Sequence, residues 1–276
     1  MVDIIKADGS SEPFQVSKLK RSLRRSGASK GEVSEIGNQI EAEIKSGMTT
    51  HEIYSRAFAM LRESEEPVAA RYSLRRALVG LGPTGFPFDD FLARLFQKGG
   101  YTTNTRQLIQ GKCAEHELDI TAYKEDDSFV AEAKFHARPG IKSDLQVVMY
   151  SFARQMDLKE AKICSKDICG ITKLIVITNT KFTSTAEHYA ECAGVPLLSW
   201  DYPRHDNLHD RIQRAGIYPI TVIQALSGAQ KQALIERNAI LCEDIINKPQ
   251  LLRYAHISTR KTEAVLSEAR QLCASN

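Results

Sequence analysis

Three residues in the middle of the chain have the side chains that phosphodiester hydrolysis needs. Asp119 is followed thirteen residues later by the run Glu132-Ala133-Lys134. Glu132 and Lys134 stand two apart on a predicted strand, so their side chains point to the same face. Asp119 lies on the preceding strand of the same predicted hairpin. Two carboxylates and one ammonium group can therefore meet at one site.

Each of these groups has a role in cutting a phosphodiester. Asp119 and Glu132 can bind Mg²⁺, a hard cation that prefers oxygen ligands. The bound ion would neutralise charge on the phosphate and lower the pKa of a water molecule. Lys134 would orient or help deprotonate that water, or stabilise the transition state by its charge.

The same residues also have a structural interpretation. An acidic and a basic residue at positions i and i+2 often form an ordinary surface pair on a half-exposed strand. The apolar neighbours of Lys134 favour function, because a charged pair in apolar surroundings costs free energy unless it is used or well partnered. These neighbours are Val130, Ala131, Ala133 and Phe135.

The elements that must position these residues follow from local patterns. A predicted helix with four apolar residues between 91 and 96 ends at Gly99-Gly100. Two strands follow, joined by a polar turn, and then helices alternate with short apolar strands. This order predicts an α/β domain with a mixed sheet. The predicted strands cover 116–124, 128–136, 173–180 and 195–200, and the predicted helices cover 143–155 and 184–193.

Two further segments flank this domain. The first begins with a strand that turns at Asp8-Gly9 and continues into helices. We expect helix caps at Ser17 and at Thr49 or Thr50 and a helix break over 65–69. A cluster of glycine and proline ends the segment, and the segment after the α/β domain is mainly helical. We expect three domains, at 1–82, 88–202 and 203–276.

Composition excludes several classes of protein. The net charge of the 276 residues is +3, so any nucleic-acid binding must come from local clusters of Lys and Arg. The six cysteines are dispersed without a CxxC pair, which argues against a zinc ribbon. We find no secretory signal and no membrane-spanning run, and we expect a cytoplasmic protein with reduced thiols. The cysteines are Cys113, Cys164, Cys169, Cys192, Cys242 and Cys273.

The central segment resembles a known nuclease family. The runs GGYTTNTRQLIQGKCAEHELDITAYKEDDSFVAEAKFH and LIVITNTKFTSTAEHYAECAGVPLLSW resemble the PD-(D/E)XK nucleases, in particular the Mrr-like type IV restriction endonucleases. The resemblance covers about 88–200. It implies a restriction-endonuclease-like mixed sheet core flanked by helices, with Asp119, Glu132 and Lys134 as catalytic residues. In the family pattern a Gly-Tyr turn precedes a helix, and a proline precedes the aspartate, where this chain has Leu118.

Further residues extend the predicted site. Gln146 and Tyr150 resemble the QxxxY motif of some members of this superfamily, and they share one helical face. The alternative is an ordinary amphipathic helix with Tyr150 in the core. Glu117, or with less support Glu115, would supply another carboxylate, because Glu117 and Asp119 share a strand face.

The N-terminal segment resembles an ATP-cone, a small nucleotide-binding regulatory domain. The runs IIKADGSSEPFQVSKLKRSL, TTHEIYSRAFAML and VAARYSLRRAL carry the resemblance. It implies binding of ATP or dATP, with a regulatory role, and Ala7 departs from it where the family usually has arginine. The alternative is a helical domain whose basic face meets DNA or a partner. The implied nucleotide-binding residues are Lys6, Glu12, Gln15, Lys18, Thr50 and Arg71; the basic face is Lys18, Lys20, Arg21, Arg24 and Arg25.

Two weaker patterns occur near the C-terminus. The run LLRYAHISTRKTEAVLSEARQL resembles a helix-hairpin-helix DNA-binding unit, although its turn lacks glycine, and a helical packing subdomain is the alternative. His205 and His209, with Asp206 and Asp210, have zinc-ligand spacing on a helix. Pro203 and Asn207 instead favour a solvated turn there.

Together these patterns predict an endonuclease that needs Mg²⁺ or Mn²⁺, cuts DNA and is regulated by ATP or dATP. Cutting two strands favours a homodimer or higher homo-oligomer. A role in restriction of foreign DNA follows from the resemblance alone. The alternative is a catalytically inactive, nucleotide-sensing, DNA-binding protein. RNA as the substrate stays open.

Overall fold

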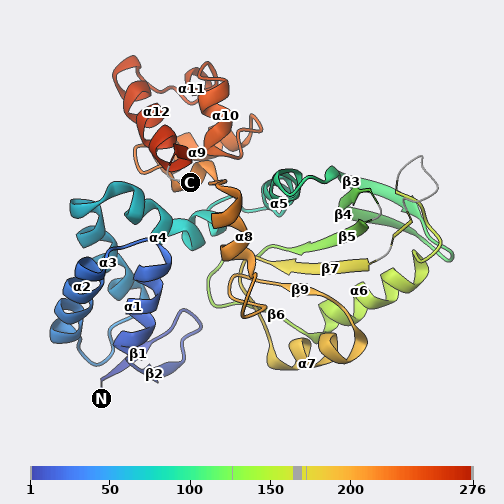
Figure 1. Ribbon diagram of the computed structural model, residues 1–276, viewed down its shortest axis with the longest axis horizontal. Helices are drawn as coiled ribbons and strands as arrows, with labels where there is room; N and C mark the ends of the chain where they lie inside the picture. Colours follow the sequence, from blue (N-terminus) through green and yellow to red (C-terminus); the bar gives the residue numbers. More distant parts are fainter. Residues whose placement is uncertain (1, 126, 164–169, 172, 275–276) are drawn as a thin grey trace.

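The computed structural model describes residues 2–125, 127–163, 170–171 and 173–274. The N-terminal helices, the central sheet and the C-terminal helices form three parts that meet around α4, α5 and α8 (Figure 1). These helices are α4 (Glu66–Val79), α5 (Phe86–Lys98) and α8 (Leu208–Ala215).

The N-terminal part is a small hairpin on a helical bundle. The hairpin turns at Gly9, which has a φ of 82° that only glycine adopts without strain. Thr49 caps α3 in a capping box with Glu52, as expected. The elements before α4 are β1 (Asp3–Ile5), β2 (Ser11–Pro13), α1 (Val16–Arg25), α2 (Lys30–Glu43) and α3 (Thr50–Ser64).

Two sequence expectations for this part were wrong in detail. Gln15, in extended conformation, is the N-cap of α1, so Ser17 already lies inside the helix. The break between α3 and α4 is limited to Glu65. Pro67 does not prolong the break, because it lies in the first turn of α4, where a missing N–H removes no helical hydrogen bond.

The central part is a five-stranded mixed sheet in the order β3-β4-β5-β7-β9. The pairs β3–β4 and β4–β5 are antiparallel, and the pairs β5–β7 and β7–β9 are parallel. A second, two-stranded sheet joins β6 and β8. The elements are β3 (Thr102–Gln110), β4 (Glu115–Lys124), β5 (Asp127–Lys134), β6 (Lys142–Ser143), α6 (Leu145–Asp157), β7 (Lys173–Thr178), β8 (Lys181–Phe182), α7 (Ser184–Ala193) and β9 (Leu197–Leu198).

The sheet confirms the mixed α/β expectation and corrects one element of it. The Gly100-Tyr101 turn leads into strand β3, whereas the family pattern places a helix there. Residues in β3 alternate between exposed and half-buried, because one side of this edge strand lies against α5. Antiparallel pairing with β4 thus outweighs the weak local signal of a polar run.

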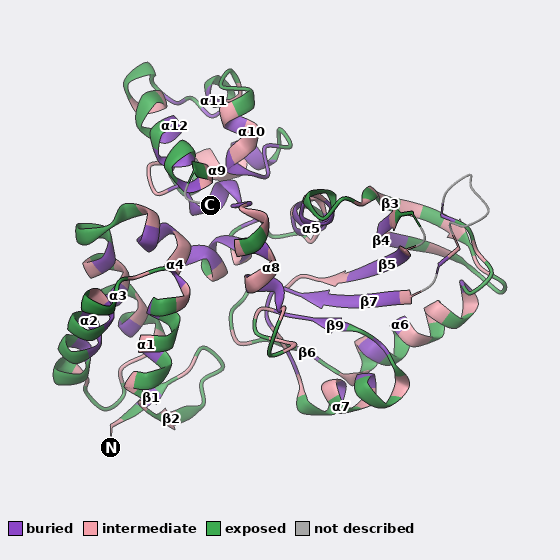
Figure 2. Cartoon of the chain, viewed as in Figure 1, coloured by how far each residue is buried: buried purple, intermediate pink, exposed green. Residues whose placement is uncertain are grey.

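Apolar residues on the two faces of the sheet belong to different cores. Val130 and Leu174 pack with α6 and α7 on one face. Ala131 and Ile175 pack with α5 on the other face. The strands β5 and β7 are buried along most of their length, as parallel neighbours covered on both faces must be (Figure 2).

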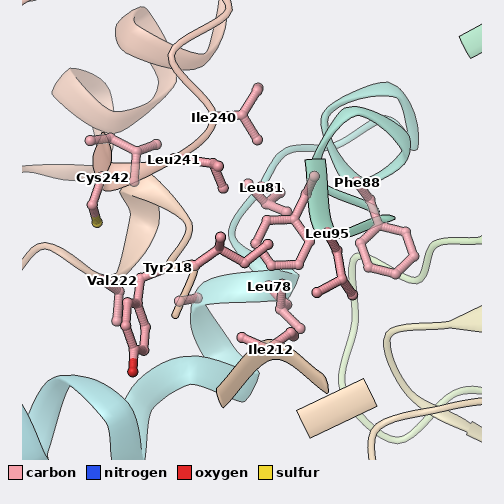
Figure 3. Packing of buried hydrophobic residues seen from close by; sticks show 14 of the residues in the cluster. Leu78, Leu81, Phe88, Leu95, Ile212, Tyr218, Val222, Ile240, Leu241 and Cys242 are labelled. Atoms are coloured by element: carbon pink, nitrogen blue, oxygen red, sulfur yellow. The ribbon is translucent and has the colours of Figure 1, made fainter. Parts of the chain in front are cut away.

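The C-terminal part shares its core with α4 and α5. Tyr218, Val222 and Leu241 belong to the same buried cluster as Leu78 and Leu81 (Figure 3). The apolar core therefore continues across both boundaries expected from the sequence, at 82–88 and at 202–203. The further elements are η1 (Ile220–Val222), α9 (Gly228–Ile235), α10 (Cys242–Asn247), α11 (Leu251–Tyr254) and α12 (Thr259–Ala274).

The predictions about membrane-spanning segments and about the cysteines can be compared with the described residues. None of their helices has the length and apolar character needed to cross a membrane. Four cysteines, Cys113, Cys192, Cys242 and Cys273, are free thiols. Cys164 and Cys169 lie outside the described residues.

Candidate active site

The candidate site lies where β4 and β5 stop pairing. The last registered pair of these strands is Ile120 with Ala131. One residue further, the Oδ2 atom of Asp119 accepts a hydrogen bond from the backbone N–H of Ala133 at 2.7 Å. Strand β5 meanwhile stays paired with β7 as far as Lys134. The Asp119 side chain thus takes the place of a ladder bond and is held beside Glu132 and Lys134.

Glu132 is a buried carboxylate held by two cations. Its exposed fraction is 3%. Lys134 Nζ lies 2.7 Å from its Oε1 atom, and Arg154 of α6 donates to its Oε2 atom. Arg154 also donates to the hydroxyl of Tyr150 at 2.9 Å and lies over the Tyr150 ring. The two cations offset the cost of burying this negative charge.

Asp89 of α5 adds a carboxylate that the sequence analysis did not select. It is 5% exposed, and its Oδ1 atom is buried without a hydrogen-bond partner among the described residues. Burial, and then the negative charge of Asp119, raise the pKa of Asp89 to about 8. Its sequence signal is an acid on the core-facing side of an amphipathic helix, next to Phe88 and Phe91.

The pKa of Asp119 is raised as well. Burial, and then the negative charge of Glu132, raise the pKa of Asp119 to about 6, against the lowering effects of the Ala133 N–H and Lys134. The carboxylates of Asp89 in α5, Asp119 in β4 and Glu132 in β5 thus repel one another electrostatically, so negative charge is concentrated at this site. Perturbed carboxylates gathered in this way are typical of functional sites.

The backbone of Lys134 is fixed by the neighbouring strand. Thr178 donates from its hydroxyl to the Lys134 carbonyl at 2.8 Å. Asn179 accepts from the N–H of His136 and donates to its carbonyl, both at 2.9 Å. Thr178 and Asn179 are fully buried, so the chain leaves β5 in one defined direction.

The structure places the other predicted site residues around this cluster. Gln146 is exposed in the first turn of α6. Tyr150 is 55% exposed, so the alternative that put it in the core is wrong. Glu117 is exposed on β4 opposite Leu108, and Glu115 is exposed at the start of that strand. The structure therefore brings Asp119, Glu132, Lys134 and Tyr150 into one network and leaves Glu117 at its margin.

The predicted nucleotide-binding residues divide into two places. Glu12 lies 3.2 Å from the ammonium group of Lys18 and 3.7 Å from that of Lys6. Gln15 precedes α1 beside this group, and Thr50 follows Thr49, which bridges to β1. Arg71 does not join them. It donates to the Ser26 carbonyl at 2.9 Å, at the far end of α1, about 12 Å along the helix axis from Lys18.

Part of the predicted basic face of α1 contacts the rest of the protein. Arg25 donates to Asp210 and to Asn207, each at 3.0 Å, and so ties α1 to α8. Lys20 donates to Asn38 of α2 at 2.9 Å. Arg25 and Lys20 are therefore engaged within the chain, and the exposed Lys18 pairs with Glu12, which leaves Arg21 and Arg24 as the exposed residues of this face without a pair described above.

The structure also describes residues 205–210 and the turn before α12. Asn207 caps α8, so residues from Leu208 onward are helical and the solvated-turn expectation was wrong for them. His209 is buried edge-on against Trp200, whereas His205 is exposed. No group of three or more His, Cys, Asp or Glu residues able to hold a metal occurs in the part of the chain that the structure describes. In the turn before α12, His256 has a φ of 52°. The helix-hairpin-helix motif usually has glycine in this turn, and this chain does not.

We expect Arg154→Ala to lower the free energy of unfolding by about 3 kcal/mol, because it leaves Glu132 buried with only one cation. Urea denaturation followed by circular dichroism measures the change. In the matched double variant Glu132→Gln/Arg154→Ala most of this loss should be recovered. An equal loss in the single and the double variant would show that Arg154 acts through packing alone.

The comparisons with known proteins bear on the two ends of the chain and on its family. Residues 2–80 match the ATP cone domain model, which confirms that resemblance, and residues 218–273 match the AF1548-like, C-terminal model. An uncharacterized protein of Archaeoglobus fulgidus is 30% identical over 182 residues, which are 66% of this chain and 99% of that protein. A crystal structure titled as a protein of unknown function, AF1548, matches with a TM-score of 0.56 and 28% identity over 70% of this chain and all of that chain. The chain therefore belongs to the family of this Archaeoglobus fulgidus protein and carries an ATP cone domain at its N-terminus.

Proposed function

We propose that the protein is a metal-dependent endonuclease that hydrolyses DNA phosphodiester bonds. The observation that carries this proposal is the geometry at the end of β4 and β5, where the Ala133 N–H holds Asp119 beside Glu132 and its partner Lys134. Asp89 of α5 lies near enough for its charge to interact with that of Asp119. The mixed sheet flanked by helices agrees with the architecture that the nuclease resemblance implies.

The resemblance implies Mg²⁺ or Mn²⁺, and the residues present fit such an ion in type. Asp89 and Asp119 offer oxygen ligands, and the Oδ1 atom of Asp89 is buried without a partner among the described residues. When bound, the ion would supply Lewis-acid chemistry to the phosphate and a water molecule of lowered pKa. Glu132 fits less directly, since Lys134 and Arg154 already hold both of its oxygen atoms.

The side chains of the protein supply the remaining requirements for hydrolysis. Lys134 is partly exposed and places a positive charge where a phosphate would approach the carboxylates. Arg154 is nearly buried and orients both Glu132 and the Tyr150 hydroxyl. Tyr150 is exposed and can donate its hydroxyl hydrogen to a phosphate oxygen. Negative charge that develops on the phosphate thus meets fixed donors.

The ATP cone supports regulatory nucleotide binding, and we propose ATP or dATP as its ligand. The structure provides a physical connection between the domains. Arg25 of α1 pairs with Asp210 of α8, α8 packs against α5, and α5 carries Asp89. A nucleotide that favours one position of α1 could bias the site only if the two states of the nuclease bind that nucleotide differently.

Plasmid cleavage tests the proposed function. We expect the purified protein to nick or linearise supercoiled DNA with Mg²⁺ or Mn²⁺ and to be inactive in EDTA, with ATP or dATP changing the rate. A matched Asp119→Asn protein, prepared identically, should be inactive. Cleavage that persists in the Asp119→Asn sample would assign the activity to a contaminant. Titration with modified and unmodified DNA and with RNA would define the substrate, and sedimentation would show whether a homodimer forms.

The second candidate is a nucleotide-sensing DNA-binding protein without catalytic activity. It is favoured by one observation, the occupation of both Glu132 oxygens by Lys134 and Arg154. Salt-dependent DNA binding with no cleavage under any metal, nucleotide or DNA condition would select it over the nuclease.

A further inference from the structure

A groove of about 450 Å³ lies between the ATP cone and the C-terminal part. One wall is formed by α3 and α4, and the other by η1 and the start of α9. The two walls are fixed to each other, since Thr221 of η1 donates to the Ala77 carbonyl of α4 at 2.6 Å in a buried contact. The groove is therefore a feature of the packed chain and requires both domains.

Each wall contributes one cation to the groove. Arg76 comes from the cone and Lys231 from α9, and no carboxylate lines the groove. Among the described residues, neither cation forms an ion pair with an acid, although Arg76 contacts the Nδ1 atom of His51. Glu268 attracts Lys231, but the backbone N–H groups of Gln224 and Ala225 already occupy its two oxygen atoms. Burial lowers the pKa of both cations, which indicates that water only partly solvates them.

The other residues that line the groove favour a charged ligand over an aromatic base. The Tyr54 ring is already engaged, since it stacks on Tyr72 at a centroid distance of 5.1 Å and has the Arg76 guanidinium over it at 3.7 Å. The other polar lining residues offer neutral hydrogen-bond donors, Gln224 and Gln232 among them. Two cations on opposite walls with neutral donors between them suit an elongated anion with several charges.

We propose that this groove binds a polyphosphate group, held jointly by Arg76 of the ATP cone and Lys231 of the C-terminal part. None of the six residues that the resemblance assigned to the nucleotide lines this groove, and three of them, Lys6, Glu12 and Lys18, lie on the hairpin side of the cone. A ligand in the groove contacts two domains at once. Its binding therefore favours the docked arrangement of cone and C-terminal part by mass action.

Calorimetric titration of the full-length protein tests the proposal, with inorganic triphosphate and ATP as probes and no DNA present. We expect Lys231→Gln to raise the Kd for triphosphate about tenfold, a loss of about 1.4 kcal/mol. Lys231→Arg should bind as the wild type. The matched control is Lys248→Gln, which removes an exposed lysine of the same part outside the groove and should have no effect.

Each outcome bears directly on the groove. Unchanged triphosphate affinity in Lys231→Gln would overturn the proposal, and so would a wild type that binds ATP but not triphosphate. If Lys18→Gln weakens ATP binding and leaves triphosphate binding intact, the hairpin and the groove are separate sites. Thermal unfolding of each ligand-free variant shows that its fold is kept. Because the titration contains no DNA, its result is independent of the proposed nuclease activity.

Discussion

Replacement of Lys134 by glutamine should reduce the rate of DNA cleavage by about a thousandfold and leave the fold intact. The side chain of Lys134 is 37% exposed, so a phosphate can reach its positive charge. Removal of one fixed donor to a developing negative charge typically has an effect of this size. The fold should persist because Arg154, the more buried of the two cations, remains paired with Glu132, whereas Lys134 is partly exposed to water.

Single-turnover cleavage and urea denaturation together measure this prediction. The matched control is Lys173→Gln, which removes a similarly exposed lysine from the neighbouring strand β7, where it pairs with Asp127. We expect the control to cut at nearly the wild-type rate. Cleavage by Lys134→Gln within threefold of the wild type would remove Lys134 from the catalytic residues. If Lys134→Gln loses cleavage rate and stability to a similar extent, Lys134 is a structural residue.

Asp89→Asn should stabilise the metal-free protein increasingly as the pH rises, while it lowers cleavage about a hundredfold. The folded-state pKa of Asp89 is raised from 3.8 to about 8. The stability that depends on its protonated form is therefore complete below pH 4 and is lost as the pH rises through 8. Asparagine stays neutral, so the variant avoids this loss.

The expected size of this stabilisation follows from the titration of Asp89. Stability changes by about 1.4 kcal/mol for each pH unit over which the folded state binds one proton more than the unfolded state. Between pH 6 and pH 8 the variant should gain about 2 kcal/mol over the wild type, with little further gain above pH 9. Urea denaturation in EDTA across this range gives the difference, and Asp3→Asn, at an exposed position, should show none. A difference that does not change with pH would mean that Asp89 is not held protonated by its surroundings.

The loss of cleavage in Asp89→Asn has a separate cause. If Asp89 is an oxygen ligand in the proposed metal site, asparagine keeps its shape but removes its charge. The apparent Mg²⁺ requirement should then rise, which a titration of rate against metal concentration shows. A variant that is more stable and equally active would confine Asp89 to the core.

Much of the candidate site could be predicted from the sequence because its signals are local. The period of two on a strand places Glu132 and Lys134 on one face, and a hairpin of adjacent strands places Asp119 next to them. The resemblance of three short N-terminal runs to an ATP cone is confirmed by the family match over residues 2–80. The expected helix start near Thr49 is a local signal as well, because its capping box joins residues only three apart.

The sequence by itself thus determined the mixed α/β class, the N-terminal cone and the catalytic candidates on adjacent strands, since each depends on neighbours within a few residues. Only the tertiary structure decided that Asp89 lies near enough to interact electrostatically with Asp119, that Arg154 holds Glu132, and that Arg71 contacts the opposite end of α1 from Lys18. It also decided that the C-terminal part shares a core with α4 and α5. These contacts join residues from separate elements, and the packing of the whole chain selects them because no local propensity encodes which distant surfaces will be buried together.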